Sequence, residues 1–181
     1  LAAGEKPFAL FLSIGTPHDP WVPENVPAEC LERFKNRRFN LPVNYLEQDD
    51  PHADNWAKLS EEERGQLTEW MRIYYAMAAN LDDNIGRLMK AVKDMGLDEN
   101  SIIVFTSDHG ELFGAHGRRA KNIFYEEAVR VPFLIKWKGK LAENVKRDFI
   151  INTVDIMPSL LSMMGLPVPK ETEGTDLSAC I

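Results

Sequence analysis

Asp108 and His109 are adjacent in the sequence, and both side chains are of types that ligate metal ions. They come shortly after residues 101–105, an apolar run that predicts a buried strand. In open α/β sheets, ligands collect at the carboxyl ends of the strands, so the pair stands where a site is expected. Lys121 follows downstream in a segment that predicts loop. Two metal-ligating side chains with a cationic side chain nearby suit a phosphoryl-like or sulfuryl-like group, whose oxygens carry negative charge.

Two loop histidines are further candidates. His18 follows a predicted strand at residues 8–14, in a loop that its prolines keep extended. His116 is flanked by glycines, which let the backbone come close to a ligand. Each candidate also has a purely structural alternative. Asp108 and His109 would then be polar turn residues, and the two histidines would be bonded to backbone or packed on a neighbour.

Several other polar residues are explained without any chemistry. His52 lies in an acidic stretch, for which a solvated loop is the better explanation. Glu126 and Arg130 are spaced for an ion pair on one turn of helix. Lys121, considered alone, would be a solvated surface lysine, as most lysines are. The candidates therefore gain weight only through their combination.

Composition and charge bound the class of protein. The 181 residues are enough for one domain with a core, and 44% hydrophobic and 27% charged residues are ordinary for a soluble globular chain. The net charge of −7 gives no support to a nucleic-acid or anionic-membrane partner. No apolar stretch approaches the roughly 20 residues of a membrane span. Cys30 and Cys180 have neither a CxxC spacing nor a neighbouring histidine, so a zinc site is not indicated.

The middle of the chain predicts a long amphipathic helix. Ser60 and Glu63 fit a capping box, and apolar residues then recur at every third or fourth position as far as Met95. Gly96 is placed to end this helix. Shorter helices are predicted over residues 27–34 and 155–164, strands over 8–14, 101–105, 131–137 and 148–152, and a long surface loop over 35–58. Strands that alternate with helices predict an α/β fold.

The same segments, taken in order, resemble the sulfatase family of the alkaline-phosphatase superfamily. The matching segments are residues 7–13 with 17–20, Tyr75 with 81–86, 101–111, 114–117 with Lys121, Glu127 with 130–132, and 155–161 with Gly165. Each segment alone is loose, but six in the same order over nearly the whole chain are specific. The resemblance implies a three-layer α/β/α sandwich with a mixed sheet, of the alkaline-phosphatase-like kind. Residues 1–181 would form the latter part of one catalytic domain.

The resemblance also implies an enzyme, a metal-dependent sulfuric ester hydrolase. In this family a cysteine is converted to formylglycine, which supplies the attacking oxygen, and a divalent cation, usually calcium, holds the sulfate. By position, Asp108 and His109 resemble metal ligands, and Lys121 resembles a sulfate-binding cation of the catalytic site. His18 resembles a contact to the sulfate or the leaving group that acts as an acid, and His116 is expected to bind substrate.

Two departures from the family pattern matter. Neither Cys30 nor Cys180 stands in the nucleophile motif, Cys-x-Pro/Ala-x-Arg, so the formylglycine and a first pair of metal-binding aspartates are expected outside this chain. We therefore expect the chain alone to be inactive and to bind metal weakly, since calcium takes six to eight oxygen ligands. His109 occupies a position that is asparagine in many members. Calcium remains the expected cation, with manganese or magnesium as alternatives. Imidazole is more at home on manganese, zinc or iron than on calcium.

Two other functions stay open. One is a phosphonate or phosphate ester hydrolase, or a phosphoethanolamine-type transferase, of the same superfamily. The other is a non-catalytic remnant that kept the scaffold. The expected partner is a small-molecule or glycan sulfate ester, with no nucleic acid and no membrane. Uncovered sheet edges predict self-association unless the missing N-terminal segment is present, and by resemblance the protein is secreted, periplasmic or lysosomal.

Overall fold

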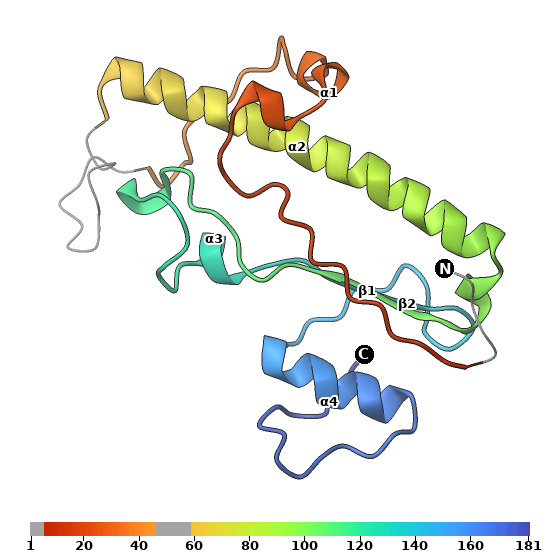
Figure 1. Cartoon of the computed structure of the whole chain (residues 1–181). Coiled ribbons are helices and arrows are strands. Elements are labelled where there is room, and N and C mark those ends of the chain that lie inside the picture. Colours follow the sequence, from red (N-terminus) through yellow and green to blue (C-terminus); the bar gives the residue numbers. More distant parts are fainter. Residues whose placement is uncertain (1–5, 46–58) are drawn as a thin grey trace. The chain divides into compact units, whose positions relative to one another are not determined.

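The computed structural model describes residues 6–45 and 59–181. The chain forms two compact units, the first made of residues 1–90 and 112–120 and the second of residues 91–111 and 121–181. Along the chain (Figure 1) the elements are η1 (Pro23–Asn25), α1 (Ala28–Glu32), α2 (Glu61–Asp94), η3 (Leu97–Asn100), β1 (Ile102–Thr106), η4 (Ala115–Gly117), α3 (Glu126–Val129), β2 (Phe133–Trp137) and α4 (Thr153–Met163). None of these described helices has the length and the apolar character that a membrane span requires.

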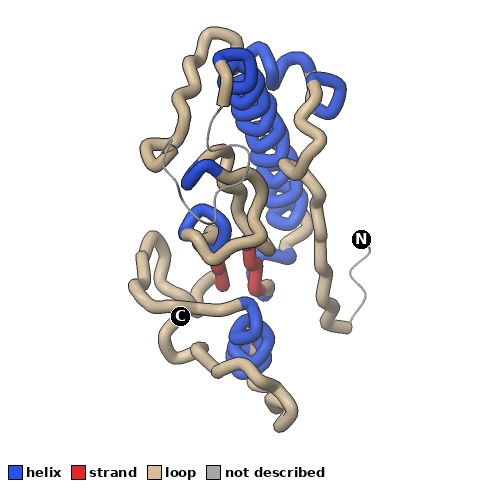
Figure 2. Tube along the Cα trace, turned by 90° about the vertical axis from the view of Figure 1, so that its left-hand side faces the viewer, coloured by secondary structure: helices blue, strands red, loops and turns tan. Residues whose placement is uncertain are grey.

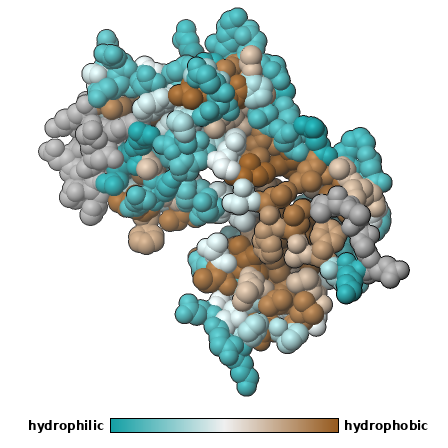
Figure 3. All heavy atoms as spheres, viewed as in Figure 1, coloured by the Kyte–Doolittle hydropathy of each residue, from teal (hydrophilic) through white to brown (hydrophobic). Residues whose placement is uncertain are grey.

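The ends of α2, the longest element, follow from the local sequence. The Glu63 N–H donates to the hydroxyl oxygen of Ser60 at 3.3 Å, and the Ser60 N–H donates to the Glu63 carboxylate at 2.8 Å. This reciprocal pair confirms the predicted capping box. Beyond the other end, Gly96 has a φ of 68°, a left-handed conformation that glycine adopts without strain. Figure 3 shows the solvent side of this helix in teal, as its charged residues require.

The core of the first unit is aromatic and gathers against α2. Trp21 is 5% exposed, and its ring centroid lies 4.6 Å from that of Phe113 and 5.8 Å from that of Trp70. The indole N–H of Trp21 donates to the carbonyl oxygen of Pro17 at 3.0 Å. The loop that carries His18 is therefore fastened to the best-packed part of this unit.

The second unit contains a two-stranded antiparallel sheet. β1 and β2 lie side by side (Figure 2), with Ile102 opposite Trp137 and Thr106 opposite Phe133. Both strands were expected from the sequence, and they are the part of the expected mixed sheet that the described residues contain. Brown, apolar atoms gather in Figure 3 where Figure 1 draws this pair, and Leu134 on β2 is 62% exposed.

Gly110 holds the segment after β1 against α3. Its N–H donates to the carbonyl oxygen of Ala128 at 2.8 Å. A Cβ atom at Gly110 would lie 1.9 Å from the carbonyl oxygen of Glu127, far inside contact distance. Only glycine allows this approach, because the obstacle is backbone and cannot rotate away.

The segment after α4 is clipped to the start of that helix through Asp155. Its carboxylate accepts the N–H of Asn152 at 2.8 Å and the N–H of Thr175 at 2.7 Å. The Thr175 amide first, and then the Asn152 amide, hold the pKa of Asp155 below its ordinary value, although burial acts in the opposite direction. Pro158 has no N–H for the carbonyl oxygen of Val154. This helix therefore depends on the clip as well as on its own hydrogen bonds.

Two of the predicted strands are wrong for the described residues. Residues 8–14 and 148–152 have no strand pairing, and Phe11 and Ile150 are 90% and 85% exposed. Both runs are apolar enough for burial, which is why the sequence predicted strands. A strand also needs a neighbour to accept and donate its backbone hydrogen bonds, and neither run pairs with a described segment.

Other boundaries differ by a few residues. α1 is shorter than the predicted helix at 27–34, and α4 begins at Thr153, so Pro158 lies in its second turn rather than its first. The predicted loop at 35–58 is described as far as residue 45, and His52 lies outside the described residues. Cys30, buried in the aromatic core, and Cys180 are both free thiols.

Replacing Gly110 with alanine is expected to destabilise the second unit. The new methyl group would force the segment after β1 away from α3 and stretch the Gly110–Ala128 hydrogen bond. Overpacking of this kind costs about 1–3 kcal/mol, to be measured by urea unfolding of wild type and variant. Gly86→Ala on α2 is the matched control, because nothing lies within 4 Å of its Cβ position. Equal effects of the two substitutions would contradict the proposed contact.

The Asp155 clip is expected to be pH-dependent. Because its native pKa is depressed, its stabilisation is complete above the ordinary aspartate pKa of about 3.9 and is lost as the pH falls through the lower native value. Hydrogen exchange of peptides covering residues 170–181 should accelerate over that range, and Asp155→Asn should give fast exchange already at pH 7. Asp148→Asn removes an exposed carboxylate without a described partner, and should leave the exchange unchanged.

Candidate functional site

Asp108 and His109 lie just past the carboxyl end of β1, as expected. The Asp108 side chain is 86% exposed, and its Oδ2 lies 3.5 Å from Nε2 of His109. Nδ1 of His109 lies 2.8 Å from the carbonyl oxygen of Gly110, which can only accept a hydrogen bond. Nδ1 must therefore carry the proton, and in the neutral imidazole Nε2 is the nitrogen with the lone pair that a metal requires.

The carboxylate of Asp108 is kept in its charged form. Desolvation would raise its pKa, but the backbone N–H of His109 at 2.9 Å and the hydroxyl of Ser107 hold the pKa below its ordinary value. A charged, solvent-facing carboxylate is ready to receive a cation without first losing a proton.

The pair fits part of a metal site. A carboxylate oxygen and an imidazole nitrogen 3.5 Å apart can both contact one cation at bond lengths of about 2.0–2.6 Å. Among residues 6–45 and 59–181, no group of three or more His, Cys, Asp or Glu side chains is arranged to hold a metal ion. The carboxylate and imidazole donors suit a divalent cation, which would need more ligands than Asp108 and His109.

Lys121 belongs to the same compact unit as this pair. It lies half-buried in the loop before α3, and its carbonyl oxygen accepts the N–H of Ile123 at 2.8 Å. Glu126 and Arg130 at the ends of α3 form the ion pair that their spacing predicted, at 3.5 Å. The role of Lys121 as an anion-binding group stays a prediction.

His18 is oriented by its neighbour Asp19 in the first unit. The backbone N–H of His18 donates to the carbonyl oxygen of Gly15 at 2.8 Å, which fixes the turn. Nδ1 lies 2.7 Å from the carboxylate of Asp19 and 3.0 Å from the carbonyl oxygen of the same residue. Both contacts are made by Nδ1, so Asp19 holds the ring of His18 by that edge.

Asp19 is in turn held by Arg119, which the sequence analysis did not single out. The guanidinium donates to the second carboxylate oxygen of Asp19 at 3.1 Å. It also lies 5.3 Å from the ring centroid of Trp21 and 5.1 Å from that of Trp70, within range of cation–π attraction. His18, Asp19 and Arg119 thus form a chain of contacts that ends on the aromatic core.

His116 is fixed by Asn44. The backbone N–H of His116 donates to the carbonyl oxygen of Asn44 at 3.0 Å. The side-chain amide nitrogen of Asn44 lies 3.1 Å from Nε2 of His116. The backbone of His116 is left-handed, with a φ of 55°. These bonds agree with the structural alternative for this histidine and also hold its ring in one orientation, so its role as a substrate contact stays a prediction.

The predicted site residues fall into two groups. Asp108, His109 and Lys121 lie in the second unit, and His18 and His116 lie in the first. The residues that position the histidines, Asp19, Arg119 and Asn44, were missed. Only Asp19 had a sequence signal, as the carboxylate next to His18 in a proline-rich loop.

The chain matches the family model described as sulfatase over residues 1–166. It is 37% identical to the ulvan-active sulfatase of Formosa agariphila over 99% of this chain and 33% of the relative. It is 33% identical to an arylsulfatase of Clostridium perfringens over 97% of this chain and 38% of the relative. The chain therefore spans about a third of the length of these relatives.

Solved structures agree on the fold. The yidJ protein of Bacteroides fragilis, assigned to the sulfatases, superposes with a TM-score of 0.78 and 36% identity over 97% of this chain and 36% of its own. A phosphonate monoester hydrolase of Agrobacterium radiobacter superposes with a TM-score of 0.58 and 30% identity over 67% of this chain and 24% of its own. These neighbours share the alkaline-phosphatase-like fold. Because the family model covers most of its length, the chain belongs to the sulfatase family.

Proposed function

We propose that this protein hydrolyses sulfuric esters. The observation that carries the proposal is the Asp108–His109 pair, two ligand atoms 3.5 Å apart at the carboxyl end of β1 in a chain of the sulfatase family. The two side chains would hold a divalent cation, calcium first, with manganese or magnesium as alternatives. That cation and a formylglycine outside residues 1–181 would polarise the sulfate group and supply the attacking oxygen.

Three residues of this chain would act on the ester itself. Lys121 would neutralise the peripheral sulfate oxygens, which keep their negative charge throughout the reaction. His18 would bind the sulfate and give a proton from Nε2 to the departing oxygen, with Asp19 holding the ring through Nδ1. His116 would contact the substrate from the turn that Asn44 fixes.

The substrate class is proposed to be a sulfated glycan. The relative at 37% identity is named for its activity on ulvan, and other curated relatives are named for 4-O-sulfate and N-acetylglucosamine-6-O-sulfate chemistry. In such an ester the leaving group is a sugar alkoxide, a poor leaving group that needs a proton. The arrangement of His18 and Asp19 supplies one.

A phosphonate or phosphate ester hydrolase is the second candidate. The 30% identity to the Agrobacterium phosphonate hydrolase favours it. Two metal-ligating side chains and a downstream lysine would also bind a phosphoryl group equally well. We also propose that the two units belong to one three-layer α/β/α sandwich. Its remaining strands would cover the exposed apolar residues of the 8–14 run and of β2. Self-association is proposed for preparations that lack those strands.

The first test is sulfate release from 4-nitrocatechol sulfate by the full-length protein. Turnover that needs calcium or another divalent cation is expected, and Asp108→Asn should lower kcat/KM by a factor of roughly 100 or more, since it removes a charged ligand. Asp148→Asn removes an exposed carboxylate with no described partner and should have no effect. Faster turnover of a phenyl phosphonate ester than of the sulfate would favour the second candidate, and no turnover of either would favour a non-catalytic role.

The contact between Asp19 and His18 predicts a dependence on the leaving group. Asp19→Asn should lower kcat/KM by about tenfold or more for a sugar sulfate, whose alkoxide must be protonated, and by less for 4-nitrocatechol sulfate. Arg119→Gln should act in the same direction, because it releases the other oxygen of Asp19. Equal losses with the two substrates would mean that the network serves only to hold the fold together.

A further inference from the structure

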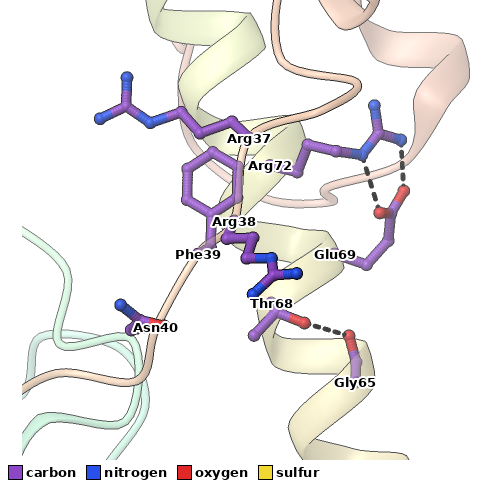
Figure 4. Close-up of a pocket in the computed structure, with 8 residues that line it drawn as sticks. All are labelled: Arg37, Arg38, Phe39, Asn40, Gly65, Thr68, Glu69 and Arg72. Atoms are coloured by element: carbon purple, nitrogen blue, oxygen red, sulfur yellow. Dashed lines mark hydrogen bonds and ion pairs between the residues drawn. The ribbon is translucent and has the colours of Figure 1, made fainter.

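A basic pocket lies in the first unit where the loop before residue 41 runs alongside α2 (Figure 4). It has a volume of about 340 Å³ and is broadly open to solvent. The lining residues are Arg37, Arg38, Phe39, Asn40, Gly65, Thr68, Glu69 and Arg72. Among the described residues the lining thus contains three arginines and one carboxylate, that of Glu69, and none of the residues discussed so far as catalytic.

The three arginines differ in what holds them. Arg72 forms a two-point ion pair with Glu69, at 2.8 and 2.5 Å, which Figure 4 shows at one wall of the pocket. Arg37 lies 5.8 Å from the ring centroid of Phe39 and 5.6 Å from that of Tyr75. These stacking contacts orient its guanidinium without neutralising it. Two of the three arginines therefore keep defined positions.

Arg38 has no hydrogen bond, ion pair or ring contact within the described residues. Its side chain extends toward α2 over Thr68 in Figure 4. Two basic residues earlier in the same segment, outside the pocket, do form ion pairs. Arg33 pairs with Asp83 at 2.7 Å, and Lys35 pairs with Glu32 at 2.9 Å. The local sequence thus neutralises its cations outside the pocket and leaves Arg38 uncompensated inside it.

We propose that this pocket binds a sulfate group of a sulfated polysaccharide, a group other than the one that is hydrolysed. Guanidinium groups bind tetrahedral oxyanions through paired N–H donors, and neither Arg37 nor Arg38 forms an ion pair with a carboxylate of the described residues. The amide of Asn40 adds a neutral donor at the rim. The proposal rests on the proposed function, in that it takes a sulfated glycan as the substrate.

The size and shape of the pocket favour one sugar unit of a longer chain. Its volume is at the lower end of the range of about 300–1,000 Å³ for small-molecule sites. The broad opening lets a polymer continue in both directions. Nucleic acid is a poorer match, because single strands bind by stacking bases on aromatic rings. Of the described residues that line the pocket, only Phe39 is aromatic, and its ring already has Arg37 over it.

The experiment is a titration of the full-length protein into fluorescently labelled octasaccharides, followed by anisotropy. Chondroitin sulfate octasaccharide should bind, and unsulfated chondroitin octasaccharide, which has the same carboxylates, should bind at least about tenfold more weakly. Arg38→Gln should raise the Kd for the sulfated chain by roughly tenfold or more, the value of a charge-assisted hydrogen bond. Arg38→Lys keeps the charge but not the paired donors, so its Kd for the sulfated chain should lie between those of the wild type and of Arg38→Gln.

Arg87→Gln is the matched control, since it removes the same charge from an exposed position on α2 outside the pocket. Because Arg38 is exposed and unpaired, its variants should keep the melting temperature and the turnover of 4-nitrocatechol sulfate of the wild type. Equal effects of Arg38→Gln and Arg87→Gln would overturn the proposal, as would equal binding of the unsulfated chain. Tighter binding of a labelled DNA octamer would overturn it too. An inactive wild-type enzyme that still binds the sulfated chain through Arg38 would refute the proposed function and leave the pocket in place.

Discussion

The close approach of Gly110 to the backbone of α3 determines where the metal-competent pair stands. Asp108 is mostly exposed, so no packing of its own side chain fixes its position. The backbone N–H of His109 and the hydroxyl of Ser107 orient its carboxylate, and the backbone is held by β1 on one side and by the Gly110–Ala128 hydrogen bond on the other. A carboxylate that must meet a cation in solvent cannot be buried for the sake of rigidity, and a glycine contact two residues away supplies that rigidity.

The histidine in the first unit is held in the opposite way, through side chains. His18 contacts Asp19, Asp19 contacts Arg119, and Arg119 lies over two tryptophans of the core. The proposed proton transfer requires a fixed ring orientation, and a carboxylate at Nδ1 gives that orientation at a partly exposed position. The stacked guanidinium holds the carboxylate in place through their hydrogen bond, and Trp21 fastens the loop backbone to the same core.

Local signals in the sequence were sufficient for features made by neighbours along the chain. The capping box at Ser60, the turn at Gly96 and the Glu126–Arg130 ion pair all follow from spacings of a few residues. The strands β1 and β2 and the place of Asp108 followed from apolar runs and their ends. Asp19 and Arg119, by contrast, are 100 residues apart, and only the folded chain reveals that they meet. The wrong strands at 8–14 and 148–152 have the same origin, since composition reports how apolar a run is but not which segment pairs with it.

Charge shows the same difference between a sum and an arrangement. A net charge of −7 argues against diffuse attraction to polyanions such as nucleic acid. Beyond about 8 Å, however, exposed charges are largely screened at physiological ionic strength, so a bound oxyanion senses mainly the groups within that distance. The charged residues described as lining the pocket beside α2 are three arginines and Glu69, whose carboxylate is already paired with Arg72. An acidic chain can therefore contain a specific oxyanion site, provided that the carboxylates near that site form ion pairs with other basic residues. The ion pairs of Arg33 and Lys35 achieve this on the residues just before the pocket.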